Sequence, residues 1–170
     1  AAGATIFESG APQADGSIAG NDNDTDALKF EPHYQRITSA DQVQIYESVM
    51  GDFANRPTTG LLFGTHYLKD NRLLPQGFDK TTADPIVAVV GGAHDDADFT
   101  GGSDTVLYSV PVSGNGSYSV SAELLYQSIS FRWAQNLRSY DAAEPKRFVG
   151  YYQQQAGTSA KLLARATAPR

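Results

Sequence analysis

The 170-residue chain contains no cysteine. Within these residues, this excludes disulfide bonds, thiolate metal ligands, thiol catalysis and the C-x-x-C-H motif that attaches haem covalently. The absence does not identify a compartment, because a secreted domain large enough to build its own core needs no cross-links.

Positive charge and long apolar runs are also scarce. The 13 Lys and Arg residues stand against 19 Asp and Glu residues, for a net charge of −6. The basic residues are scattered, which argues against nucleic acid as a partner. No run approaches the roughly 18 apolar residues that a membrane span requires. Hydrophobic residues still make up 41% of the chain, as in a globular protein with a core.

The length fits one domain, and we expect residues 1–170 to form a single domain. The first strand-like stretch, residues 4–10, begins without a preceding turn or cap. We therefore expect the native domain to start earlier, so that this chain is a fragment or a processed product that lacks its first native strand.

Strand-like patterns dominate the rest of the chain. The clearest hairpin joins residues 106–112 to residues 118–126 through Ser113-Gly114-Asn115-Gly116. Helices are predicted at 129–140 and at 144–155, where Pro145 lies in the first turn and Gly157 follows the end. Further strands are predicted at residues 42–50 (with an amphipathic helix as the alternative), 60–68, 85–90 and 159–166. This order favours a mainly β fold, an immunoglobulin-like β-sandwich with short peripheral helices near 130–156.

Two acidic loops are candidates for cation binding. Asp22, Asp24 and Asp26 offer carboxylates at alternate positions, and Ca²⁺ prefers six to eight oxygen ligands. The loop lacks the glycine and glutamate positions of an EF-hand, so a solvated Asx-turn loop is the alternative. A second loop carries Asp95, Asp96, Asp98 and Asp104, and a solvated connection explains it better than a cation does.

Catalytic signatures are missing from the sequence. The three histidines, His33, His66 and His94, form no H-x-x-x-H or H-E-x-x-H pair, and there is no G-x-S-x-G motif. We therefore expect no enzyme, although a hydrolase whose carboxyl groups meet only in the fold stays open. Aromatic residues 131, 133, 151 and 152 suggest a sugar-stacking platform, but aromatic residues at helical spacing more often lie in a core.

Several segments, in this order, resemble the C-terminal haem-free β domain of bacterial exported multihaem c-type cytochromes. They cover most of the chain, and none is a catalytic signature. The segments are Phe7-Glu8-Ser9-Gly10, Gly20-Asn21-Asp22-Asn23-Asp24, Glu31-Pro32-His33, Gln42-Val43-Gln44-Ile45-Tyr46-Glu47 and Tyr67-Leu68-Lys69-Asp70-Asn71-Arg72-Leu73-Leu74-Pro75-Gln76-Gly77-Phe78-Asp79-Lys80.

The resemblance implies a periplasmic or extracellular location, because haem is attached covalently there. It also implies a non-catalytic accessory or docking domain that supports electron transfer, with a haem-bearing domain or subunit as its partner. His33 is then the candidate contact to a haem held by that neighbour, since haem iron accepts imidazole from any chain that reaches it. Because arginine is enriched in interfaces, the stretch Lys69, Asp70, Asn71 and Arg72 is the candidate docking segment.

Two alternatives stay open at this point. The acidic loops and the aromatic residues suggest a secreted Ca²⁺-stabilised binding module, with polysaccharide as its candidate ligand. For Lys69 to Arg72, the alternative to docking is structural, with an Asp70–Arg72 ion pair or backbone caps that fix the loop.

Overall fold

The computed structural model describes residues 3–114 and 116–169, and the chain divides into two compact units. The terminal unit comprises Ala1–Ile6, Ala11–Ala19 and Pro111–Arg170. The central unit comprises Phe7–Gly10 and Gly20–Val110. Each unit has its own buried cluster and is described by itself below.

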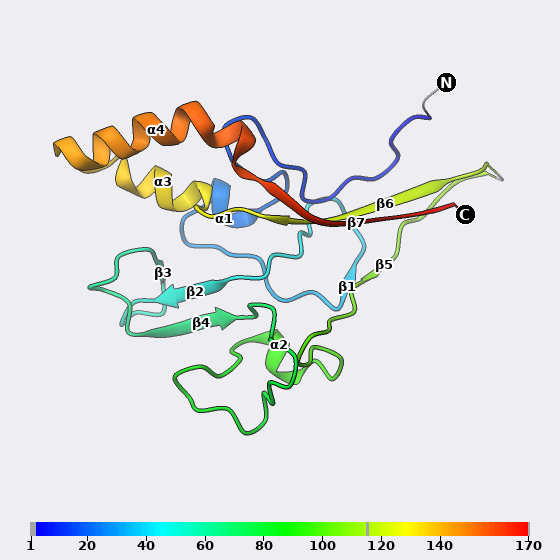
Figure 1. Ribbon diagram of the computed structural model, residues 1–170, viewed down its shortest axis with the longest axis horizontal. Coiled ribbons are helices and arrows are strands. Elements are labelled where there is room, and N and C mark those ends of the chain that lie inside the picture. The colour runs from blue at the N-terminus through cyan, green and yellow to red at the C-terminus, as the bar shows by residue number, and fades with distance from the viewer. Residues whose placement is uncertain (1–2, 115, 170) are drawn as a thin grey trace. The chain divides into compact units, whose positions relative to one another are not determined.

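Two helices form the core of the terminal unit, α3 (Phe131–Leu137) and α4 (Ala143–Ser159) (Figure 1). Helix α3 starts at Ser130, whose hydroxyl accepts a hydrogen bond from the Trp133 amide, as an N-cap does. Small residues allow close packing, and the buried cluster consists of Ala134, Tyr152 and Ala156, with Ile129 and Phe148 against it. The two helices that the sequence predicts are confirmed, but the predicted end of the second is wrong, because α4 continues through Gly157 to Ser159.

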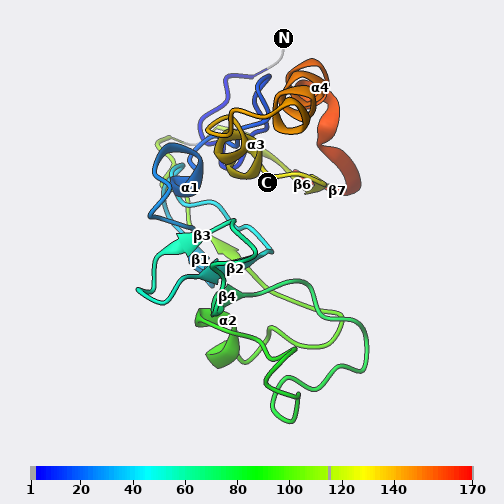
Figure 2. The same ribbon diagram turned by 90° about the vertical axis from the view of Figure 1, so that its left-hand side faces the viewer.

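The terminal unit also contains a long antiparallel ribbon, in which β6 (Ser119–Tyr126) pairs with β7 (Lys161–Pro169) (Figures 1 and 2). The last strand is thus confirmed, but the predicted hairpin is wrong. Strand β6 pairs with the C-terminal strand, and the first arm of the expected hairpin shrinks to β5 (Leu107–Tyr108). Residue 115, in the expected hairpin turn, lies outside the described residues.

Alternation along β6 is compatible with the predicted hairpin. Val120, Ala122 and Leu124 face Ala168, Ala166 and Ala164 across the ladder, whereas Glu123 pairs with Arg165. This period of two is satisfied by any antiparallel partner, so it fixes the strand but not the identity of its neighbour.

The central unit has little regular structure. Its largest sheet is three-stranded, with the order β3 (Pro57–Thr58), β2 (Ser48–Gly51) and β4 (His66–Asp70). A second sheet pairs β1 (Arg36–Ile37) with β5 in parallel. Two single-turn helices, α1 (Asp22–Thr25) and α2 (Gly92–Asp95), complete the described elements of this unit.

Most strand predictions in the central unit are too long or wrong. Residues 4–10 form no strand, and residues 42–50 contribute only the end of the predicted segment, as β2. The 60–68 stretch begins as a turn, and residues 85–90 make a single bridge at Val90. In the 42–50 and 85–90 segments, side chains take up amides that a ladder would otherwise pair: those of Val43, Glu47 and Ile86 donate to Glu31, Asn71 and Asp84.

The interior of the central unit is partly polar. Its buried apolar cluster is small and consists of Val89, Ala93 and Phe99, against which Tyr46 and Leu74 pack. The unit also buries polar and charged residues: Asn21, Glu31, His33, Asp52, Lys69, Asp70, Asn71 and Asp96. These residues position the site described next.

The architecture is therefore mixed. The described residues form small sheets of two, three and two strands together with helices, so the mainly β class is not confirmed. Among those residues there is no helix with the length and apolar character needed to cross a bilayer.

Candidate functional site

The centre of the polar interior is His33, whose side chain is fully buried. It follows Glu31-Pro32 in an extended segment between α1 and β1. Its Nδ1 atom lies 3.1 Å from the side-chain nitrogen of Gln44 and 3.1 Å from that of Asn71. Segments distant in the sequence thus converge on one imidazole ring.

The two amides are oriented by backbone groups. The Tyr34 amide donates to Oε1 of Gln44 at 2.8 Å, and the Glu47 amide donates to Oδ1 of Asn71 at 2.9 Å. Each carboxamide therefore turns its NH₂ group toward His33. Because Nδ1 faces two donors, it must be an acceptor, and the neutral ring carries its proton on Nε2.

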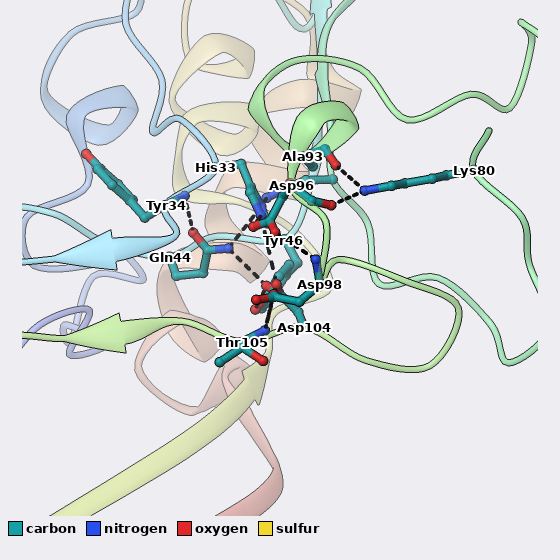
Figure 3. A network of polar contacts seen from close by, with 11 residues as sticks. His33, Tyr34, Gln44, Tyr46, Lys80, Ala93, Asp96, Asp98, Asp104 and Thr105 are labelled. Carbon is teal, nitrogen blue, oxygen red and sulfur yellow. Dashed lines mark hydrogen bonds and ion pairs between the residues drawn. The ribbon is translucent and has the colours of Figure 1, made fainter.

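Two buried carboxylates face the protonated edge of the ring. Nε2 of His33 donates to Oδ2 of Asp96 at 3.1 Å, and Oδ1 of Asp104 lies 3.9 Å from the same nitrogen (Figure 3). The side chains of Asp96 and Asp104 are only 4% and 3% exposed. Burial at this level requires hydrogen-bond donors to replace water.

Those donors are present. The Asp98 amide donates to Oδ1 of Asp96 at 3.0 Å. Asp104 accepts from the Tyr46 hydroxyl at 2.5 Å and from the Thr105 amide at 2.8 Å. Burial and the hydrogen bond to Asp104 raise the pKa of Tyr46 above its ordinary value, so this hydroxyl stays a donor. Hydrogen bonds from protein groups therefore replace water around both carboxylates.

Aromatic rings and one lysine enclose this group. Phe99 makes an edge-on contact with His33 at a centroid distance of 5.0 Å and stacks on Tyr46 at 6.5 Å. The Lys80 ammonium lies 5.7 Å from the centre of the Phe99 ring and donates to the carbonyl oxygens of Ala93 and Asp96. Lys80 thus brings a positive charge to the rim of an otherwise acidic cluster.

His33, Asp96 and Asp104 also meet a geometric criterion for a metal site, with one ligand atom from each residue within 4.8 Å of the others. The surrounding groups oppose imidazole coordination, however. A histidine that binds a metal through one nitrogen normally donates the other N–H to an acceptor. Nδ1 of His33 faces two donors instead, so His33 is poorly suited to be a ligand in this arrangement. The two carboxylates are the only members of the group that suit a hard cation.

A second buried polar group joins β4 to the segment that leads into β2. The Lys69 ammonium donates to the Ile45 carbonyl at 2.8 Å and pairs with Oε1 of Glu47 at 3.3 Å. Burial lowers the pKa of Lys69 and raises the pKa of Glu47, while the ion pair opposes both shifts. This lysine is 1% exposed and anchors the backbone, so it is not available as a nucleophile.

The candidate Ca²⁺ loop takes a different form. Asp22 and Asp24 lie in the single turn of α1, and Asp26 caps Leu28 by accepting from its amide at 2.9 Å. Among the described residues, the ligand atoms that gather as a group of three belong to His33, Asp96 and Asp104. Asp22, Asp24 and Asp26 are not brought together as such a group.

The candidate docking segment is largely interior. Lys69, Asp70 and Asn71 are buried, and Arg72 is the member whose side chain is exposed, at 57%. Arg72 binds Asp70 through two hydrogen bonds of 2.9 and 2.6 Å, which is the predicted structural ion pair. Burial leaves Arg72 as the residue of this segment that can reach a partner.

The aromatic residues near 131–152 do not share one surface. Tyr152 is buried in the core of the terminal unit, whereas Tyr151 is 62% exposed on the same helix. Their adjacent positions on α4 direct them to different sides, as expected for residues i and i+1.

Sequence reasoning finds the members of the His33 site only separately. It singles out His33, Asp96 and Asp104, but it does not bring them together. It gives no role to Gln44 or Tyr46, and it assigns Asn71 to the docking segment instead. The sequence signal for Gln44 and Asn71 is weak because side-chain amides are common in β-rich segments. Only the structure shows that both amides contact His33.

Comparison with known proteins adds no family. No family model, no curated protein and no solved structure matches this chain.

Proposed function

We propose that this chain is a non-catalytic accessory or docking domain of an exported multihaem cytochrome, which supports electron transfer without carrying a haem. The sequence resemblance suggests this context, and one observation from the site supports the non-catalytic part. His33, Asp96 and Asp104, the groups best able to do acid–base chemistry, have buried side chains; His33 is hydrogen-bonded to Asp96 and lies 3.9 Å from Asp104. A general acid or base must reach its substrate within hydrogen-bond distance.

In this proposal the partner is a haem-bearing domain or subunit in the periplasm or outside the cell. The missing cysteines mean that the haem is attached to the partner. His33 could contact that haem only if its buried hydrogen bond to Asp96 opened, so it is the weaker candidate for contact with the partner. Arg72, the exposed residue of the docking segment, is the stronger candidate for contact with the partner. The expected immunoglobulin-like β-sandwich and the expected single domain over residues 1–170 stay part of this proposal.

The test is purification of the protein from its natural source, followed by intact-mass and visible-absorbance analysis. We expect a Soret band that co-purifies with this domain, on a longer precursor or on a second chain. A colourless protein of about the mass of this chain, 18.2 kDa, would contradict the proposal.

A second candidate function is a secreted Ca²⁺-stabilised binding module. The observation in its favour is the pair of buried carboxylates, Asp96 and Asp104, whose oxygens face one point beside His33. Ca²⁺ takes oxygen ligands, so these carboxylates are better candidates than those at Asp22, Asp24 and Asp26.

Thermal unfolding in Ca²⁺ and in EDTA distinguishes the second candidate from the first. A cation that binds only the native state must raise the melting temperature with its concentration. If Ca²⁺ stabilises the protein, Asp104→Asn should abolish the effect and Asp24→Asn should leave it intact. Identical melting in Ca²⁺ and EDTA would remove this candidate.

A further inference from the structure

An apolar turn in the central unit is unusually exposed. Leu61, Leu62 and Phe63 lie between Gly60 and Gly64, and their exposed fractions are 72%, 98% and 65%. Single exposed apolar residues are common on protein surfaces. Three in succession at a turn are not, and they indicate a surface that is covered in use.

A fourth large apolar side chain lies at the same end of the sheet. Gly51, at the end of β2, pairs with Pro57 of β3 and with His66 of β4. The loop 52–56 and the turn 60–64 are therefore held near the same end of β2 (Figure 1). Phe53, on loop 52–56, is 81% exposed. We call Phe53, Leu61, Leu62 and Phe63 the apolar tip.

The apolar tip is nearly free of uncompensated charge. Arg56 is the only charged residue between positions 53 and 65, and it pairs with Asp52 at 2.7 Å. Asp52 also accepts hydrogen bonds from the amides of Ala54 and Arg56. Moving this end of the sheet out of water would therefore desolvate few unpaired groups.

Part of the turn's backbone is also satisfied internally. The amides of Phe63 and Gly64 both donate to the Gly60 carbonyl, at 2.9 and 3.0 Å. Backbone groups that are already paired cost less to bury in an apolar phase. The turn thus presents side chains outward while it binds two of its own amides.

The apolar tip is narrow as well as apolar. Its four side chains expose on the order of 600 Å², taking roughly 200 Å² for a large side chain, and they lie on two turns. A standard protein interface spreads over about 20–30 residues on each partner and mixes apolar with polar area. A few apolar side chains projecting from turns are instead suited to the interfacial zone of a bilayer, where affinity scales with buried apolar area.

We propose that the apolar tip inserts into the interfacial region of a lipid bilayer with zwitterionic headgroups. The net charge of −6 disfavours an anionic surface, so apolar contact has to provide the affinity. The inserted residues anchor the protein without spanning the membrane. This inference does not rest on the cytochrome context and stands or falls separately from it.

Sedimentation with phosphatidylcholine vesicles tests the proposal on the full chain. We expect measurable partitioning of the unmodified protein and a loss of at least about tenfold for Leu62→Glu, because each buried leucine contributes about that factor. The matched control is Ile86→Glu, which changes an 80% exposed apolar residue outside the apolar tip and should leave partitioning unchanged. Circular dichroism confirms that both variants fold.

A fluorescence measurement locates the contact. Trp133 is the only tryptophan of the chain, so Leu62→Trp in a Trp133→Phe background reports on the apolar tip alone. We expect a blue shift on adding phosphatidylcholine vesicles and quenching by brominated lipids. The proposal is overturned if the vesicles do not bind, if Leu62→Glu and Ile86→Glu behave alike, or if binding requires anionic lipid and disappears in salt.

Discussion

The two units of this chain are stabilised in different ways. The terminal unit consists mainly of regular elements, a 17-residue helix and a ribbon of eight- and nine-residue strands, and its small core is Ala134, Tyr152 and Ala156. In the central unit no described strand exceeds five residues, and its interior contains His33 with two buried carboxylates. Backbone ladders dominate the first unit and side-chain hydrogen bonds the second.

The difference shows where each unit is vulnerable. A buried polar network stabilises a fold only while each member has its partner, because an unsatisfied buried group costs its full desolvation energy. A helix or a strand ladder distributes its stability over many equivalent hydrogen bonds. We therefore expect single polar substitutions to damage the central unit and steric substitutions to damage the terminal unit.

The largest effect is expected for His33→Ala. Removing the imidazole leaves Asp96, Gln44 and Asn71 without a shared partner inside the protein. Breaking a buried network of this kind costs about 3–5 kcal/mol of unfolding free energy. Urea denaturation followed by the NMR signals of the buried Phe99 ring measures the loss in the central unit.

His94→Ala is the matched control for His33→Ala, because the His94 side chain is 61% exposed and pairs with an exposed carboxylate. It should change the unfolding free energy by less than about 0.5 kcal/mol. Equal effects of the two substitutions would show that the His33 network does not stabilise the central unit.

Gly16→Ala should destabilise the terminal unit by about 2–4 kcal/mol. Gly16 has a φ of +89°, and an added Cβ would lie 2.2 Å from the Tyr152 hydroxyl oxygen and 3.2 Å from Cβ of Ala156. The left-handed backbone and the overpacking of a small core both contribute. Trp133 fluorescence measures the unfolding of this unit. The control is Gly114→Ala: Gly114 also has a φ of +89° but has open space around it, so this substitution measures the cost of the left-handed backbone without overpacking.

Tyr46→Phe should cost about 2 kcal/mol at neutral pH, since it removes a hydrogen bond to a buried carboxylate. It should also change the pH dependence. The folded-state pKa of Tyr46 is raised above its ordinary value of 10.0, so the stabilisation is complete below pH 10 and is lost as pH rises through the raised pKa.

Urea unfolding between pH 9 and pH 11 checks this dependence. The unmodified protein should lose stability more steeply than Tyr46→Phe. The slope should not vanish in the variant, because burial also raises the pKa of Tyr34 and Tyr108. Parallel curves would mean that neither burial nor Asp104 raises the pKa of Tyr46 in the folded protein.

The same contrast explains which parts of the fold are predictable. The helices near 131–159 follow from Ser130, Pro145 and a local apolar pattern, and β7 follows from its own composition. These signals act within a few residues of one another. The partner of β6 does not follow, because alternation fits any antiparallel neighbour, and a short loop made the nearer strand the expected one.

The site in the central unit is less predictable for a related reason. His33 and Asp96 are separated by 63 positions, and Gln44 reaches Asp104 across 60. Each residue alone suits a surface loop, and only their contact makes them a buried network. The 42–50 segment fails as a long strand for the same cause, because side chains from elsewhere in the chain bind its backbone: the amides of Val43 and Glu47 donate to Glu31 and Asn71.

The smallest effect is expected in the ribbon of the terminal unit, for Glu123→Gln. Arg165 approaches Glu123 at 2.5 Å across β6 and β7, but the two side chains are 56% and 36% exposed, respectively. Exposed pairs contribute little, so we expect a loss of at most about 0.5 kcal/mol, and less in high salt. Trp133 fluorescence in urea, at low salt and at 1 M salt, measures the change. A loss above about 1 kcal/mol would mean that side-chain pairing, and not the backbone ladder, stabilises the ribbon, and the contrast between the two units would then not hold.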